Sequence, residues 1–203
     1  MRPDAPTAVA SELTDEPGSW PVTDSQHAYR SSWIVNLRQD RVHRPGHPDD
    51  ARDRLVLEHP GAVVVLAVDD RERVACLRQY RHAGPGWFVE LPAGVLDSAE
   101  PPLQTARREL REEVELAADE WRDLGTLRPS VGITAERQHL FLARGLSHVD
   151  RGDFELQAEE AEMSVFWAPV DDMVEAVLDG RLTTSALVTA VLSYDALRRR
   201  GRL

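Results

Sequence analysis

The chain has 203 residues, of which 42% are hydrophobic and 29% are charged, and its formal net charge at pH 7 is −11. This length and balance indicate one globular domain with room for a small extension. A chain this acidic repels the phosphates of nucleic acids, and the sequence has no basic stripe interleaved with aromatic residues. We therefore expect no nucleic-acid partner.

Residue usage excludes further classes. The 24 basic residues are all arginines, which excludes a P-loop lysine, a Schiff-base lysine and a Ser-Lys pair. The single cysteine, Cys76, excludes a disulfide framework within one chain. No apolar stretch approaches the roughly 18 residues of a membrane span, and residues 1–30 lack a signal-peptide pattern. We therefore expect no membrane partner and a cytoplasmic location.

The first 60 residues lack the features of a core domain. Residues 1–30 are rich in Pro, Asp, Ser and Thr without any period, which predicts a flexible tail. Strand-like alternation follows in residues 31–44 and again in 54–58, separated by a turn-rich stretch at 45–50. We therefore divide the chain into a tail (1–30), a small extension of N-terminal strands (31–60) and a main domain (61–203).

The main domain mixes strands and helices without βαβ alternation. We expect strands at 62–68 and 74–80, joined as a hairpin, and at 87–91, 121–127, 138–143 and 164–168. Apolar residues at spacings of three and four predict a helix from Pro101–Pro102 to Val114. Two further helices are expected, one capped by Asp171 and ended by Gly180, the other from 183–184 to 199. The class is α+β or a three-layer sandwich with a mixed sheet.

The expected helix at 101–114 carries Glu109, Glu112 and Glu113 at positions i, i+3 and i+4, so their carboxylates share a flank beside the apolar stripe. One interpretation is a solvated charged face, balanced by arginines of the same helix. The other is a site for a hard cation, because Mg²⁺ prefers a few carboxylate ligands and takes its remaining ligands from water and phosphate.

The wider spacing favours the second interpretation, because it resembles the Nudix box. The matching positions are Gly94, Glu100 six residues later, then Arg108-Glu109-Leu110 and Glu112-Glu113. One position departs, since Glu115 stands where the box has a glycine that usually allows positive φ at a helix exit.

Shorter motifs resemble the ADP-ribose pyrophosphatase branch of that family. They are Gln79-Tyr80-Arg81, Glu90-Leu91-Pro92-Ala93-Gly94, the segment 130–136 (with Val131 where that branch usually has proline), the acidic segment 159–163, and Asp179-Gly180-Arg181-Leu182. The resemblance covers roughly residues 33–195, and other nucleotide-sugar branches share several of these motifs.

The resemblance implies roles for particular residues. It implies a divalent metal, Mg²⁺ or else Mn²⁺, held by Glu109 and Glu113, with Glu112, the Ala93 carbonyl and Glu162 as further ligands and Glu100 as an outer one. Arg108 would orient the glutamates. Glu159, with Glu160 as the alternative, would take the proton of the attacking water. A flexible acidic surface loop is the competing interpretation of residues 159–162.

Substrate contacts are implied with their own alternatives. Arg54 and Arg81 are candidates for phosphate or ribose, or else form surface salt bridges. Glu90 pairs with one of them or binds a ribose hydroxyl, and Glu136 belongs to the substrate-binding motif at 130–136. Trp33 stacks on a base or packs as a strand aromatic. The seven histidines show no metal spacing and are interpreted as structural.

The resemblance implies an α/β/α sandwich with a mixed sheet and an enzyme that hydrolyses the pyrophosphate of a nucleoside diphosphate linked to another group. ADP-ribose, cleaved to AMP and ribose 5-phosphate, is the leading substrate. The alternatives are another nucleotide sugar or dinucleotide, and a domain that senses nucleotides without turnover. In this branch the N-terminal strands cross to a second subunit, so a homodimer is expected.

Overall fold

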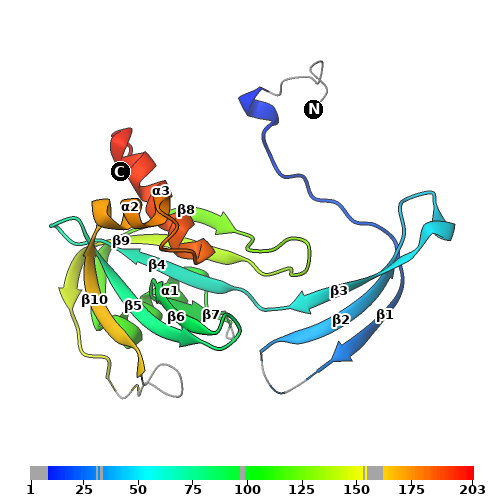
Figure 1. Cartoon of the computed structure of the whole chain (residues 1–203), viewed down its shortest axis with the longest axis horizontal. Coiled ribbons are helices and arrows are strands. Elements are labelled where there is room, and N and C mark those ends of the chain that lie inside the picture. Colours follow the sequence, from blue (N-terminus) through cyan, green and yellow to red (C-terminus); the bar gives the residue numbers. More distant parts are fainter. Residues whose placement is uncertain (1–8, 31, 33, 97–98, 153, 155–161) are drawn as a thin grey trace.

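A computed structural model of the protein describes residues 9–30, 32, 34–96, 99–152, 154 and 162–203 (Figure 1). The strands and helices of these residues, in chain order, are β1 (Val22–Tyr29), β2 (Asn36–Val42), β3 (Arg52–Glu58), β4 (Ala62–Ala67), β5 (Arg73–Arg81), β6 (Gly86–Glu90), β7 (Ala93–Val95), α1 (Pro102–Val114), β8 (Leu116–Leu127), β9 (Gln138–His148), β10 (Ser164–Pro169), α2 (Val170–Leu178) and α3 (Ser185–Arg199).

Strand β4 shows why the main domain has three layers. Its residues Val64 and Leu66 enter one hydrophobic core, which α2 and α3 cover, whereas Val63 and Val65 enter a second core, which α1 covers. A strand covered on both faces is apolar throughout rather than alternating. The continuous apolar run at 62–68 is therefore explained, and the expected α/β/α sandwich is confirmed.

The central sheet has the order β7-β4-β9-β8, in which β4 runs parallel to β9 and antiparallel to β7. The expected mixed sheet is thus confirmed, but the hairpin expected between residues 62–68 and 74–80 is wrong. Strand β5 belongs to a separate antiparallel sheet, β10-β5-β6, and meets the end of β4 through one isolated bridge between Val68 and Val74. The hairpin fails because β7 and β9 already occupy both edges of β4.

The N-terminal strands form a third sheet, β1-β2-β3, which projects away from the main domain (Figure 1). The tail expected over residues 1–30 is therefore wrong for Val22–Tyr29, which form β1. Every residue of β1 is exposed, so no hydrophobic alternation marks the strand in the sequence. Hydrogen bonds hold it instead, including one donated by the Ser25 hydroxyl to Asp40 Oδ1 at 2.7 Å.

The two C-terminal helices begin close to where they were expected. Helix α2 follows Pro169 as its N-cap, so the cap predicted at Asp171 is wrong, and Asp171 lies in the first turn, where its charge favours the helix dipole. Gly180, with φ +72°, follows the helix as predicted. No helix of the described residues is long and apolar enough to cross a membrane.

The arginines at the end of α3 are paired rather than simply solvated. Arg198 forms ion pairs with Glu72, Asp171 and Asp195. The Tyr194 hydroxyl, on a fully buried ring, donates to Glu72 at 2.8–2.9 Å. We call this group the α3 cluster; its members are Glu72, Arg144, Asp171, Tyr194, Asp195, Arg198 and Arg199.

Candidate active site

Helix α1 brings two carboxylates against strand β7. Glu109 and Glu113 lie one helical turn apart and are only 9% and 5% exposed. The backbone N–H of Ala93 donates to Glu113 Oε2 at 2.8 Å. Burying two like charges so close together costs free energy, so a solvated helix face is the wrong interpretation for this pair. The arrangement favours a bound cation.

Gly94 allows these carboxylates to approach the β7 backbone. A Cβ atom placed on Gly94 would overlap the Cγ and carboxylate atoms of Glu109. Any other residue at this position would therefore displace the Glu109 side chain. The missing side chain at Gly94 therefore makes room for the carboxylate of Glu109.

Arg108 forms ion pairs with three glutamates, two in α1 and one just before it. Its guanidinium pairs with Glu112 at 2.7 Å, with Glu109 at 2.8 Å and with Glu100 at 3.5 Å. Burial lowers the pKa of Arg108, but the charges of Glu109, Glu112 and Glu100 outweigh burial and hold the pKa above its ordinary value. We call Glu100, Arg108, Glu109, Glu112 and Glu113 the α1 cluster.

A cavity of about 490 Å³ opens beside the α1 cluster. Its walls are formed by α1 and β7, by β5 and β6, and by β4. Residues just after β3, residues around the start of β9 and the first turn of α3 complete them. The polar and charged side chains that line it are His59, Gln79, Arg81, Glu90, Glu109, Glu113, Glu136, Gln138, Thr184 and Ser185.

Arg81 and Glu90 form an ion pair in the cavity wall. The Arg81 guanidinium contacts both carboxylate oxygens of Glu90, the shortest distance being 2.6 Å between Nη2 and Oε2. The pairing expected as one role for Glu90 is therefore present. It fixes the planar guanidinium in the lining of the same cavity as Glu109 and Glu113, so a positive charge and a carboxylate pair face one space.

Comparison with known proteins decides the family. The NUDIX domain family matches residues 58–187, well over half of the chain. The chain belongs to the Nudix family.

Individual relatives are similar over most of the chain. An ADP-ribose pyrophosphatase of Mycobacterium tuberculosis is 40% identical over 176 residues, covering 86% of this chain and 83% of the relative. A CMP-5'-(N-acetyl-N-hydroxy-3-aminopropyl)phosphonate hydrolase of Streptomyces rubellomurinus is 31% identical, covering 68% of this chain and 65% of the relative. The crystal structure of an ADP compounds hydrolase superposes with a TM-score of 0.72 at 17% identity, covering 94% of this chain and all of the other. The last comparison shows the fold alone.

The one departure from the Nudix box, Glu115 in place of glycine, does not change the backbone conformation after α1. Glu115 follows α1 with φ 55° and ψ 41°, the left-handed conformation that the box glycine usually provides. Its N–H donates to the Arg111 carbonyl at 3.0 Å, and Arg151 lies 3.5 Å from its carboxylate. The helix exit therefore keeps the expected geometry with a residue that adopts it at some cost.

Nudix enzymes typically depend on a divalent metal, and the carboxylates of this chain fit one. Among the described residues no three His, Cys, Asp or Glu side chains already surround a single point. Two buried carboxylates, Glu109 and Glu113, face a polar cavity instead. Mg²⁺ keeps several waters and takes further oxygens from phosphates, so a site with few protein ligands suits it.

Reasoning from the sequence missed several cavity residues. His59 was interpreted as structural, yet it lines the cavity, with Nδ1 3.9 Å from Glu136 and accepting the Gly61 N–H. Gln138 donates to Glu136 at 2.8 Å, and its own buried Oε1 has no hydrogen-bond partner in the described structure. Only Glu136 of this group was predicted, and no local pattern marks the other two.

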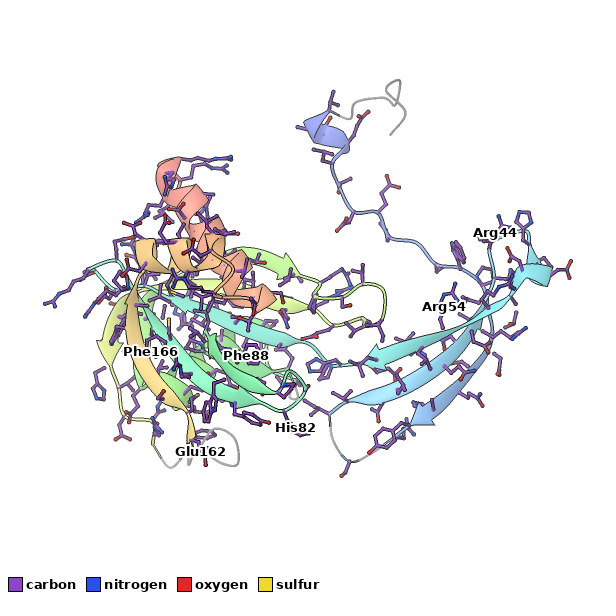
Figure 2. All side chains as sticks on the ribbon, viewed as in Figure 1. Arg44, Arg54, His82, Phe88, Glu162 and Phe166 are labelled. Carbon is purple, nitrogen blue, oxygen red and sulfur yellow. The ribbon has the colours of Figure 1, made fainter. Side chains whose placement is uncertain are left out.

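Some predicted residues do not reach the cavity. Arg54 lies in β3, and Figure 2 shows it in the N-terminal sheet, far from the main domain of its own chain. Glu162 is exposed before β10 and is absent from the cavity lining. Trp33, Glu159 and Glu160 lie outside the described residues.

Proposed function

We propose that this Nudix enzyme hydrolyses ADP-ribose to AMP and ribose 5-phosphate with Mg²⁺ as its metal. The observation that carries the chemistry is the buried pair Glu109 and Glu113, set beside Gly94 in a cavity that also holds Arg81. The similarity to the ADP-ribose pyrophosphatase of Mycobacterium tuberculosis supports the choice of substrate.

Glu109 and Glu113 would hold the metal, with Glu112 and the Ala93 carbonyl as further ligands. A bound divalent ion neutralises pyrophosphate charge and acidifies water. Arg108 keeps Glu109 and Glu112 oriented through the ion pairs described above. Arg81, braced by Glu90, would contact a phosphate through its guanidinium.

We further propose that Glu159, with Glu160 as the alternative, takes the proton of the attacking water, and that Glu162 supplies an additional ligand. Glu162 directly precedes Met163, which packs against the core that α1 covers. Met163, the last residue of the acidic motif, thus lies on the α1 side of the main domain, and this supports the proposal.

We also propose a homodimer in which the N-terminal strands, together with Arg54 and Trp33, reach the cavity of the second subunit. Support comes from the N-terminal sheet, where Val22, Tyr29 and Leu55 are exposed without a core of their own. Sedimentation at micromolar concentration tests this proposal, and a monomer there would contradict it. A cytoplasmic location also remains a prediction.

The deciding experiment measures phosphate-ester products from ADP-ribose, NADH, ADP-glucose, GDP-mannose and nucleoside triphosphates, with Mg²⁺ or Mn²⁺ and with chelator as the control. We expect ADP-ribose to be cleaved fastest and chelator to abolish the reaction. Preference for another nucleotide would keep the chemistry and replace the substrate, an outcome for which the CMP-conjugate hydrolase among the relatives gives a precedent. Nucleotide binding without any turnover would indicate a sensor.

A further inference from the structure

The first turn of α3 lies at the active-site cavity, and its backbone N–H groups have no acceptor among the described residues. The Thr184 side chain does not cap the helix, because its hydroxyl donates to the Val89 carbonyl at 3.4 Å. The first intrahelical bond runs from the Val188 N–H to the Thr184 carbonyl. The N–H groups of the three intervening residues have no acceptor in the described part of the chain, and Ser185, Ala186 and Leu187 all line the cavity.

A second donor group in the same cavity also lacks a partner. Gln79 is only 4% exposed and lines the cavity from β5. Its carboxamide makes no hydrogen bond to any described residue, whereas the neighbouring Arg81 is tied to Glu90. The carboxamide is not among the fully buried groups that lack a partner, so it stays accessible from the cavity that it lines. A ligand in the cavity can therefore replace the water there and take over the hydrogen bonds of Gln79.

We propose that the first turn of α3 and the Gln79 carboxamide form a phosphate subsite that works without the metal. The start of a 15-residue helix presents converging N–H groups and a partial positive charge, which suit phosphate oxygens. The nucleotide identity rests on the proposed function, since these donors by themselves specify only a phosphate group.

The proposed subsite would offset the repulsion between a phosphate and the carboxylates of the cavity. Glu109 and Glu113 line the same space and repel a phosphate whenever no cation lies between them. Donors from α3 and β5 give the phosphate a neutral but polar contact that does not depend on those carboxylates. Nucleotide binding in the absence of metal should therefore depend on Gln79 and α3, and removing the Glu113 charge should not weaken it.

Titration calorimetry of ADP with chelator present tests the subsite, because turnover is then blocked. Gln79→Leu keeps the volume of the side chain and removes its hydrogen bonds. Ser185→Pro removes one N–H at the first helical position, where proline is well tolerated. Thr184 has ψ 124°, which suits a residue before proline. Ser185→Ala is the matched reference, because it lacks the hydroxyl and retains the N–H.

We expect Gln79→Leu to weaken ADP binding about 10-fold, and Ser185→Pro to bind about 5-fold more weakly than Ser185→Ala, as for hydrogen bonds to a charged group. Adenosine, which has no phosphate, should bind all variants equally. The subsite is wrong if wild-type protein binds no ADP in chelator, if both variants bind within 2-fold of their references, or if adenosine binding falls equally.

A parallel ADP-ribose cleavage assay separates this proposal from the proposed function. Loss of metal-free ADP binding in the variants of a protein that does not cleave ADP-ribose would support the subsite and remove the substrate assignment. Cleavage of ADP-ribose by the wild type, with unchanged ADP binding in folded variants, would remove the subsite and keep the function. Thermal melting of each variant establishes that it is folded.

Discussion

The α1 cluster and the α3 cluster are built from similar parts and differ in charge balance. In each, one arginine contacts three carboxylates: Arg108 in the first and Arg198 in the second. The α3 cluster adds Arg144 and Arg199, so its three carboxylates meet three arginines. In the α1 cluster Glu100, Glu109 and Glu112 share Arg108, and Glu113 adds another negative charge.

The difference indicates two separate purposes. Balanced ion pairs with a buried tyrosine fix the end of a helix. An excess of carboxylates, two of them buried, suits the metal site proposed above. Changes in the α1 cluster should therefore reduce turnover and spare stability, and changes in the α3 cluster should do the reverse. This opposition is a stricter test than a loss of activity alone, because unfolding lowers both quantities together.

The largest effect is expected for Glu113→Gln. The amide can still accept the Ala93 N–H but removes the charge that would hold the metal, so kcat should fall about 100- to 1,000-fold. The melting temperature should stay the same or rise, since a like-charged pair in α1 is relieved. Glu120→Gln, at an exposed position in β8, removes the same charge as a control. Near wild-type turnover for Glu113→Gln would contradict the metal assignment.

A smaller loss is expected for Gly94→Ala, which should move Glu109 because the new methyl group overlaps its carboxylate. A displacement of about 1 Å at a catalytic centre commonly costs 10- to 100-fold in rate. Overpacking should also lower the free energy of unfolding by about 1–3 kcal/mol. Gly18→Ala provides a control, because nothing lies within 4 Å of a Cβ built there. Full activity in Gly94→Ala would show that Glu109 tolerates another position.

The α1 cluster was predictable from sequence because its chemistry is local. Three glutamates spaced along one helix share a face whatever the rest of the chain does. His59 and Gln138 were missed because separate segments bring them together, and each is an ordinary residue in its own segment. Gln79 was noticed only as part of a motif and was given no role. Sequence patterns that repeat within one element are readable, whereas a wall assembled from several elements requires the fold.

The strands, like the site residues, were predictable only where the pattern lies within one segment. The apolar run at 62–68 predicted a buried strand correctly, but its neighbours β7 and β9 depend on contacts between distant segments. Pairing with the next strand along the chain is the commoner outcome, so the hairpin prediction failed. Strand β1 was missed for the opposite reason, since an exposed strand of polar residues carries no hydrophobic period.

Tyr194→Phe tests the other half of the comparison. Losing the hydroxyl leaves Glu72 with fewer partners, so the free energy of unfolding should fall by about 1–2 kcal/mol while kcat stays within 2-fold. Calorimetric melting and the ADP-ribose assay measure the two quantities. A drop in kcat without a drop in stability would contradict this prediction and show that the α3 cluster contributes to catalysis.

The same tyrosine predicts a pH dependence. Burial, the hydrogen bond to Glu72 and its charge raise the pKa of Tyr194 to about 12. Because the folded pKa lies above the unfolded value of about 10, this contribution is complete below pH 10 and is lost as pH rises towards 12. The chain contains no lysine to obscure the effect. The stability of Tyr194→Phe should therefore decline less steeply between pH 10 and 12 than that of the wild type.

The smallest effect is expected at Glu115, which belongs to neither cluster and has a left-handed backbone conformation. A residue with a Cβ in the left-handed conformation is destabilised by about 1–2 kcal/mol relative to glycine, partly offset by the greater freedom of glycine in the unfolded chain. Glu115→Gly should therefore raise the free energy of unfolding by about 0.5–1 kcal/mol without changing kcat. Glu115→Ala keeps the strain and loses the contact with Arg151, so it should lower stability slightly. Equal stability of the glycine and alanine variants in chemical denaturation would show that the exit from α1 is unstrained, and the usual box glycine would then need another explanation.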